Sequence, residues 1–339
     1  MKTPLFISAL AMTLFGGGHL EARDTLARVT ERGAVHCGSH INRAGFASRD
    51  ANENWHGFDV GICRALAAVI FNDPSAVYFV PLSAQERFDA LAAGDVDVLA
   101  RSTTWTFLRD IDDGLTFAAT YYYDGQGFMV KRDIGVSSAL ELDGATICIE
   151  KDTTTERNLN DYFLFNGLTY TPVLVENSDE AKRKYQEDAC EVFTDDIAAL
   201  ASSRAGFVDP GAHVILSEVV SKEPLGLVVR SGDDHWANIV RWTLFALIAA
   251  EELGVTSTNL DEVRNSSTSP EIRRLLGREG DFGLEIGLDN DWAARAIAAV
   301  GNYGELFSST IGDQTPIGLA RGLNAQWTQG GLLYAPPFR

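Results

Sequence analysis

The first third of the chain alternates short apolar runs with longer stretches in which apolar residues recur at helical spacing. In order, this pattern predicts a strand over residues 35–37, a polar loop to Trp55, a helix over 59–70, a strand over 77–80, a helix over 84–92 and a strand that starts at Val96. Strands that alternate with helices in this way are typical of βαβ units in a parallel sheet.

A second series with the same alternation runs from residue 145 to about residue 218. It predicts strands over 146–149, 171–175 and 192–194, a helix that ends at Leu164 and a helix over 178–187. Thr153 and Glu156 have the spacing of a capping box, so the first of these helices should begin there. Because this series repeats the outline of the first, we expect a second lobe of the same α/β type.

Two extended segments, 121–129 and 225–229, join the two series. The chain would therefore cross twice between two lobes, with a cleft between them and lobe 2 inserted within lobe 1. We assign residues 23–124 to the first part of lobe 1, 125–225 to lobe 2, and 226–339 to the return into lobe 1 and a C-terminal extension. In residues 226–339 we expect helices over 235–252 and 291–300, turns over 256–269 and a Pro/Gly-rich tail.

Composition and charge narrow the class of function. The chain has 339 residues, of which 45% are hydrophobic and 22% charged, as in an ordinary soluble globular protein of about two domains. Its formal net charge is −19 at pH 7. Nucleic acids and anionic membrane surfaces would repel such a chain, so we expect neither as a partner.

The N-terminus has the pattern of a secretory signal peptide. Lys2 is followed by an apolar stretch through Phe15 that is too short to span a bilayer. We place the cleavage after Ala22, so that residues 1–22 are the signal peptide and the mature protein is expected to be exported. A buried N-terminal helix is the alternative.

Four cysteines are present, Cys37, Cys63, Cys148 and Cys190. An even number of cysteines in an exported chain permits disulfides, and pairing the first two and the last two would place one bridge in each half of the protein. Four buried thiols are the alternative. The spacing of these cysteines matches no zinc pattern, and we expect no metal.

The segment 98–110 contains the most informative chemistry of the chain. The apolar end of a strand gives way to a cluster of hydroxyls that includes Ser102 and Thr104, and Arg109 follows. A guanidinium grips a carboxylate through two parallel hydrogen bonds, and hydroxyls can donate to a carboxylate or accept from an ammonium, so this cluster is a candidate carboxylate receptor. The alternative is a solvated loop in which Thr104 or Thr106 caps a helix.

The stretch Gly57-Phe58-Asp59, followed by a helix with small residues on one face, resembles the signature of the family-3 solute-binding proteins of ABC transporters. Trp105, the segments 124–130 and 153–156, the four cysteines and the long C-terminal part resemble the general L-amino-acid-binding proteins within that family. Two positions depart from the pattern. Gly61 stands where the motif usually has an acidic residue, and Asp152 stands where the family usually has a glycine.

The resemblance implies the type II periplasmic binding protein fold, in which two βαβ lobes joined by two crossover strands enclose the ligand. It also implies a set of ligand-binding residues. These are Arg109 for the α-carboxylate, Ser102 and Thr104 for the carboxylate and the α-ammonium, Asp195 for the ammonium, Thr154 and Thr155 for closing over the carboxylate, and Phe46 as an aromatic wall. Apart from the resemblance, Arg101, just ahead of Ser102, is a candidate for reading an acidic side chain.

Several of these residues have simpler alternative roles. Arg109 could pair with Asp110 or Asp113 at the surface, and Arg101 could be a surface arginine paired with a carboxylate. Asp195 could cap a helix that begins near Ile197. Asp196 competes with Asp195 for the ammonium.

The function expected from this resemblance is that of a periplasmic receptor. A monomer would capture L-amino acids of broad or polar specificity by lobe closure and deliver them to a membrane permease, without a cofactor and without catalysis. The alternative is an exported enzyme on the same scaffold, such as a cyclohexadienyl-dehydratase-like lyase, for which only Asp152 or Glu156 offers a candidate acid or base. A sensory ectodomain is disfavoured, because no transmembrane segment or signalling domain follows.

Overall fold

A computed structural model describes residues 24–112 and 114–339 of the chain. The predicted signal peptide, residues 1–22, lies outside the described residues. Of the described helices, none has the length and apolar character that crossing a membrane requires.

Lobe 1 is built on a five-stranded sheet with the strand order β4-β1-β5-β12-β6. Its strands are β1 (Val35–Ser39), β4 (Val77–Pro81), β5 (Val98–Thr104), β6 (Leu115–Asp124) and β12 (Glu223–Arg230). β1 pairs in parallel with β4 and β5, whereas β12 is antiparallel to both β5 and β6. The parallel part therefore has the βαβ arrangement that the alternating pattern predicts.

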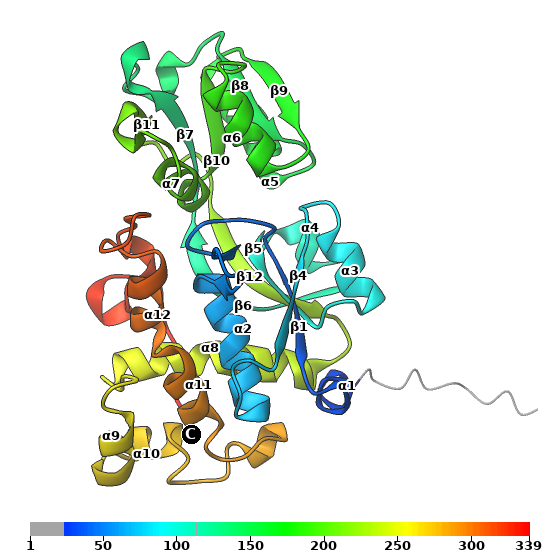
Figure 1. Cartoon of the computed structure of the whole chain (residues 1–339), viewed down its shortest axis with the longest axis vertical. Helices are drawn as coiled ribbons and strands as arrows, with labels where there is room; N and C mark the ends of the chain where they lie inside the picture. The colour runs from blue at the N-terminus through cyan, green and yellow to red at the C-terminus, as the bar shows by residue number, and fades with distance from the viewer. Residues whose placement is uncertain (1–23, 113) are drawn as a thin grey trace, which may run out of the picture.

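Lobe 2 is built on a second five-stranded sheet with the order β11-β7-β10-β8-β9. Its strands are β7 (Gln126–Lys131), β8 (Thr146–Glu150), β9 (Thr171–Val175), β10 (Val192–Asp196) and β11 (His213–Ile215). β8 is parallel to β9 and β10, and β7 is antiparallel to β10 and β11. In Figure 1 lobe 2 stands above lobe 1, and the chain passes between them where β6 leads into β7 and again where it enters β12. The predicted two-lobe α/β fold is confirmed.

The helices cover the two sheets. Lobe 1 has α1 (Thr25–Arg32), α2 (Phe58–Phe71), α3 (Arg87–Ala93) and α4 (Phe107–Asp110), and lobe 2 has α5 (Thr154–Asn166), α6 (Ser178–Gln186) and α7 (Ile197–Ala205). After β12 the chain forms α8 (Asp234–Glu252), α9 (Leu260–Ser266), α10 (Pro270–Leu275), α11 (Trp292–Val300) and α12 (Tyr303–Thr310), which lie against lobe 1 (Figure 1). A two-strand ribbon, β2 (Ser48–Arg49) and β3 (Trp55–His56), interrupts the long polar loop.

The C-terminal part explains the unusual Gly61. α2 is buried along most of its length and contacts α11 and α12. A Cβ atom at Gly61 would lie 2.3 Å from Cδ1 of Leu306, which belongs to α12. Leu306 therefore fills the space that any side chain at position 61 would need.

Two disulfides are present, one in each lobe. Cys37 of β1 is bonded to Cys63 of α2, and Cys148 of β8 is bonded to Cys190, which precedes β10. The sequence left two alternatives open, disulfides or four buried thiols, and the structure contains the disulfides.

Three predicted elements differ from the structure. The turns expected over 256–269 contain helix α9, because Leu260 and Val263, one helical turn apart, face the core. α3 begins at Arg87 and not at residue 84. The strand that was expected to end before the hydroxyls continues as far as Thr104, because β12 supplies it with a pairing partner.

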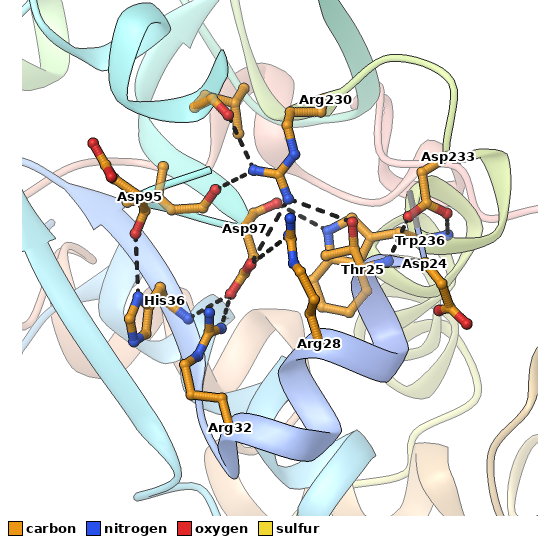
Figure 2. Close-up of polar contacts among 12 residues, drawn as sticks. Asp24, Thr25, Arg28, Arg32, His36, Asp95, Asp97, Arg230, Asp233 and Trp236 are labelled. Atoms are coloured by element: carbon orange, nitrogen blue, oxygen red, sulfur yellow. Dashed lines mark hydrogen bonds and ion pairs between the residues drawn. The ribbon is translucent and has the colours of Figure 1, made fainter. Parts of the chain in front are cut away.

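A buried ion-pair network fixes the start of β5, the strand that carries Ser102 and Thr104. The fully buried Asp97 lies one residue before β5, and Arg28, Arg32 and Arg230 surround its carboxylate (Figure 2). The same carboxylate accepts a hydrogen bond from the backbone N–H of His36 at 2.8 Å. The Asp97 carboxylate thereby links α1, β1 and β12 at the start of β5. The hydroxyl cluster lies at the other end of this strand.

Candidate functional site

The cleft between the lobes contains two adjoining cavities. The inner pocket is narrow, about 40 Å³, and the outer chamber is about 380 Å³. Both are lined by residues of both lobes, and His40, Arg43, Arg101, Glu150 and Ser178 border both. The inner pocket brings together seven of the eight predicted ligand-binding residues, namely Arg101, Ser102, Thr104, Arg109, Thr154, Thr155 and Asp195.

Arg109 is held at the inner pocket by the cap of a short helix. Thr106 is the N-cap of α4, and its hydroxyl accepts a hydrogen bond from the Arg109 backbone N–H. The Arg109 side chain donates from Nη1 to the Thr104 carbonyl at 2.8 Å, which leaves the other guanidinium nitrogens for a ligand. Asp110 accepts from the indole of Trp105 and forms no ion pair with Arg109 among the described residues, while Asp113 lies outside them.

Ser102 has a strained backbone conformation, and a chain of buried hydrogen bonds holds it in place. Its φ is +44°, in the left-handed region that is rare for a residue with a side chain. The Ser102 N–H donates to the hydroxyl of Tyr121 at 2.9 Å, and that hydroxyl donates to Asp59 Oδ1 at 2.9 Å. Burial raises the pKa of Asp59 to about 7. Ser102 Oγ is buried and has no hydrogen-bond partner within the described part of the chain, so it is available to a ligand.

The wall contributed by lobe 2 begins at the N-terminus of α5. Thr153 is the N-cap, and its hydroxyl accepts from the Glu156 N–H and donates to the Glu150 carbonyl. Only half of the predicted capping box forms, because the Glu156 carboxylate accepts from the N–H of Asp152. The first turn, which includes Thr154 and Thr155, presents unpaired N–H groups and the positive end of the helix dipole, an arrangement that favours an anion.

Asp152, two residues before Thr154, lies outside the inner pocket. Its φ is +60°, a conformation that glycine adopts more readily than other residues, and its side chain is exposed. Neither Asp152 nor Glu156 lines the inner pocket. The carboxylates that do line it are Glu150, Asp195 and Asp196.

The carboxylate of Asp195 already has partners within the protein. Its Oδ2 accepts from Ser178 Oγ at 2.7 Å and lies 3.7 Å from Arg43 Nη2, across the cleft. The N-cap of α7 is the next residue, Asp196, so Asp195 is not the cap. Asp196 is buried, and its pKa is raised well above the usual range by burial and by the neighbouring carboxylates Glu223, Asp124 and Asp195.

Phe46 lies elsewhere than expected. Only 1% of its surface is exposed, and its ring contacts Phe58 and Tyr122 in the core of lobe 1. The backbone around it is fixed by hydrogen bonds from the amides of Phe58 and Asp59 to the carbonyls of Gly45 and Phe46. A ring enclosed in this way cannot form a wall of the inner pocket, so the expected role of Phe46 is corrected.

Arg101 is not the surface arginine of the simpler alternative. It is 6% exposed, its Nε donates to the Leu82 carbonyl at 2.9 Å, and it borders both cavities. Burial lowers its pKa to about 10, a shift that Glu150 opposes. Arg101 therefore remains charged at neutral pH and faces the cleft.

Several residues of the site were not predicted. Arg43 and His40 come from the long polar loop, Arg87 from the start of α3, and Glu150 from the end of β8. The pKa of His40 is lowered well below its usual value by burial and by nearby arginines, so its ring is neutral at pH 7. An isolated polar residue in a loop carries no periodic signal by which the sequence could identify it.

Glu223, also not predicted, connects the two lobes at the second crossover. It is 1% exposed and accepts hydrogen bonds from Thr104 Oγ1 at 2.5 Å, Thr154 Oγ1 at 3.3 Å and Asn158 Nδ2 at 2.6 Å. Thr104 belongs to lobe 1 and the other two donors to lobe 2. This single carboxylate thus bridges both walls of the inner pocket.

The described residues contain no group of three or more His, Cys, Asp or Glu side chains suited to hold a metal ion. The site instead combines guanidinium, hydroxyl and helix N–H groups with carboxylates in one pocket. An arrangement of this kind can bind a small molecule that has both a carboxylate and an ammonium group.

Comparison with known proteins points in the same direction. The model of the bacterial extracellular solute-binding proteins, family 3, matches residues 35–258. The chain is 56% identical over 339 residues to the glutamate/glutamine/aspartate/asparagine-binding protein BztA of Rhodobacter capsulatus, with 100% of both chains covered. It is 50% identical over 342 residues to the general L-amino acid-binding periplasmic protein AapJ of Rhizobium johnstonii, again with 100% of both covered.

A solved structure shares the architecture. An ABC transporter periplasmic binding protein from Brucella ovis with glutathione bound is 50% identical, with a TM-score of 0.91, and the match covers 93% of this chain and 99% of that one. The family model ends at residue 258, whereas the alignments with BztA and AapJ extend over the whole chain. The C-terminal part of the sequence is therefore shared with these relatives.

Proposed function

The chain belongs to family 3 of the bacterial extracellular solute-binding proteins, and on that premise we propose that it is the periplasmic receptor of an ABC transporter that takes up L-amino acids. The observation that carries the proposal is the inner pocket, where groups suited to a carboxylate and groups suited to an ammonium meet between the lobes. BztA and AapJ, whose names describe amino-acid-binding proteins, support it.

The α-carboxylate of the ligand would lie between Arg109 and the N-terminus of α5. Arg109 supplies a charge-assisted hydrogen bond, and the first-turn N–H groups at Thr154 and Thr155 add neutral donors and the helix dipole. The unpartnered Ser102 hydroxyl is a further donor. Together these groups replace the water that the carboxylate loses on entering the cleft.

The α-ammonium would lie beside Asp195. Its carboxylate faces the inner pocket on the lobe 2 side, opposite Arg109. Because a buried ammonium needs a negative partner, this placement allows the zwitterion to be enclosed with both charges paired. Asp196, also in the lining, is the second acid available to it.

Ligand binding would favour the closed arrangement of the lobes. Arg109 belongs to lobe 1 and Asp195 to lobe 2, so a ligand can use both only when the lobes meet. A ligand that contacts one arrangement better shifts the population towards it. The closed receptor, a monomer in this proposal, would then dock on the membrane permease and release the amino acid.

A γ-linked peptide is a second candidate ligand. The outer chamber of about 380 Å³ adjoins the inner pocket and offers space beyond that needed by an amino acid. The Brucella ovis protein contains glutathione, a tripeptide whose first residue retains its free α-carboxylate and α-ammonium groups. We propose that such a ligand would use the inner pocket for these two groups and the outer chamber for the rest.

The enzyme alternative receives less support. A lyase would need an acid or base placed over a reacting carbon, and the two residues suggested for this role, Asp152 and Glu156, do not line the inner pocket. The relatives reported above are solute-binding proteins. We therefore propose a receptor that catalyses no reaction and is exported by the signal peptide in residues 1–22.

Isothermal titration of the mature protein with L-amino acids tests the proposal. Arg109→Ala should weaken binding by about 10- to 100-fold, because a hydrogen bond to a charged group contributes about 1.5–3 kcal/mol. Arg49→Ala is the matched control, since Arg49 pairs with Glu53 at the surface outside both cavities. Unchanged affinity of Arg109→Ala would remove Arg109 from the site, and product formed from a prephenate-like acid would favour the enzyme.

A further inference from the structure

The charges that line the inner pocket are not balanced. Its lining contains four arginines, Arg43, Arg87, Arg101 and Arg109, and three carboxyl groups, those of Glu150, Asp195 and Asp196, while the buried carboxylate of Glu223 lies behind Thr104 and Thr154. His40 is neutral, and the raised pKa of Asp196 shifts the balance further in the positive direction. Because unpaired charge in a buried site is costly, the lining favours a ligand with a net negative charge over a zwitterion with none.

Two of these arginines lie where the inner pocket opens into the outer chamber. Arg43 and Arg101 line both cavities, whereas Arg109 lines the inner pocket and not the outer chamber. The α-carboxylate position between Arg109 and α5 therefore leaves Arg43 and Arg101 for a different part of the ligand.

Both arginines have unused donors. Arg101 is 6% exposed, its Nε is bonded to the Leu82 carbonyl, and its Nη atoms have no hydrogen-bond partner in residues 24–112 and 114–339. The side chain of Arg43 is 11% exposed, and its only described partner is Asp195 at 3.7 Å, beyond hydrogen-bond distance. The N–H groups that are left over on both arginines face the cleft, where they can donate to an anionic group of a ligand.

We propose that Arg43 and Arg101 form a second anion subsite that binds the distal carboxylate of an α-amino dicarboxylic acid. This subsite rests on the proposed function, and it assigns the preferred ligand class as amino acids with a net charge of −1. A distal carboxylate placed at the junction of the two cavities accepts hydrogen bonds from Arg101 and Arg43, while the α-carboxylate stays with Arg109.

Binding involves an exchange of partners at Arg43. In the structure Arg43 is paired with Asp195, the carboxylate that the ligand ammonium needs. When the ammonium takes Asp195, Arg43 loses that partner, and a distal carboxylate replaces it. An amide ligand such as L-glutamine offers only a neutral oxygen, so it does not replace the counter-charge that Arg43 loses at Asp195, and only the carboxyl groups of Asp196, Glu150 and Asp59 remain near it.

The experiment compares L-glutamate with L-glutamine, which have nearly the same shape and differ by one charge. Both are titrated calorimetrically into the wild-type protein, Arg43→Gln, Arg43→Lys and the control Arg49→Gln. We expect the wild type to bind L-glutamate about tenfold or more tightly than L-glutamine. Arg43→Gln should weaken L-glutamate by about tenfold and change L-glutamine by less than about threefold, Arg43→Lys should retain part of the preference, and Arg49→Gln should match the wild type.

Each other outcome overturns a specific statement. Equal weakening of both ligands in Arg43→Gln would make Arg43 a structural residue only. Equal or tighter binding of L-glutamine by the wild type, a comparison that needs no variant to fold, would refute the second anion subsite. If the wild type binds neither ligand nor any other amino acid, the proposed function itself fails.

Discussion

Removing the carboxylate of Asp97 should destabilise the folded protein strongly. The side chain of Asp97 is fully buried, and Arg28, Arg32 and Arg230 surround it. Arg28 and Arg32 are 42% and 28% exposed, so each of these pairs contributes only about 0–1 kcal/mol to stability. Arg230 is 3% exposed, and its guanidinium would lose this counter-charge in Asp97→Ala.

The size of the effect follows from the buried partner. Breaking a buried ion pair by removing one member costs about 3–5 kcal/mol. This range includes the cost of leaving the His36 N–H without its acceptor. We therefore expect the free energy of unfolding of Asp97→Ala to fall by about 3–5 kcal/mol, with an unchanged dependence on denaturant.

Equilibrium unfolding in urea, followed by circular dichroism, measures this difference. Asp289→Ala is a suitable control, because Asp289 is 71% exposed and pairs with Arg295 at the surface. The control should change stability by about 1 kcal/mol or less. A loss below about 1 kcal/mol in Asp97→Ala would refute the reasoning, since it would mean that Arg230 does not depend on this carboxylate.

Three further predictions concern pH, covalent links and the contact between lobes. The pKa of Asp59 is about 7 in the folded state, and its ordinary value is 3.8. Between about pH 4 and 7 the folded protein therefore keeps a proton that the unfolded chain releases, so the contribution of Asp59 to stability falls as the pH rises through this range. Asp59→Asn should therefore lose less stability than the wild type between pH 5 and 8, by about 2 kcal/mol in urea titrations, and an identical pH profile would contradict the buried titration. Replacing both Cys148 and Cys190 by Ala opens a link of sequence separation 42 and should lower the free energy of unfolding by about 4 kcal/mol, whereas equal stability to the oxidised wild type would show that the bond is not formed. Glu223→Ala should increase the radius of gyration of the ligand-free protein in small-angle X-ray scattering, because it removes the carboxylate that both lobes share, and an unchanged radius would rule out this role.

The helices and strands were largely predictable, because apolar residues recur along the chain at the spacing of the element that forms. The strands β1, β4, β8 and β9 are short apolar runs between polar turns, and they form where the pattern places them. The pairing order was not predictable, because an apolar run contains no information about its neighbour. Thus nothing in residues 223–230 predicts that β12 lies between β5 and β6.

The candidate site was predictable for some residues that lie near the end of a regular element, although Glu150 at the end of β8 and Arg87 at the start of α3 were missed. Arg109 lies in the short helix after β5, Asp195 lies near the end of β10, and Thr154 follows a helix cap, so local patterns indicated all three. Phe46 was assigned to the pocket by its place in a loop, but hydrophobic burial with Phe58 determined its position. Arg43 reaches the cleft through the path of a long loop, which local sequence does not specify.

Glu223 shows a further limit. Its position at the first residue of β12 gives no local signal of importance. It matters because three donors from distant parts of the chain, Thr104, Thr154 and Asn158, converge on it. Convergence of this kind is a property of the folded chain and appears only with the three-dimensional structure.

The order of strands in the lobe 1 sheet also has a consequence for how the protein acquires its structure. β12 occupies the place between β5 and β6, yet it follows the whole of lobe 2 in the chain. A chain that emerges N-terminus first therefore leaves the first sheet incomplete until residue 230 is available, while β7 to β11 are contiguous and can assemble earlier. We expect lobe 2 to fold first and the receptor cleft between the lobes to form last.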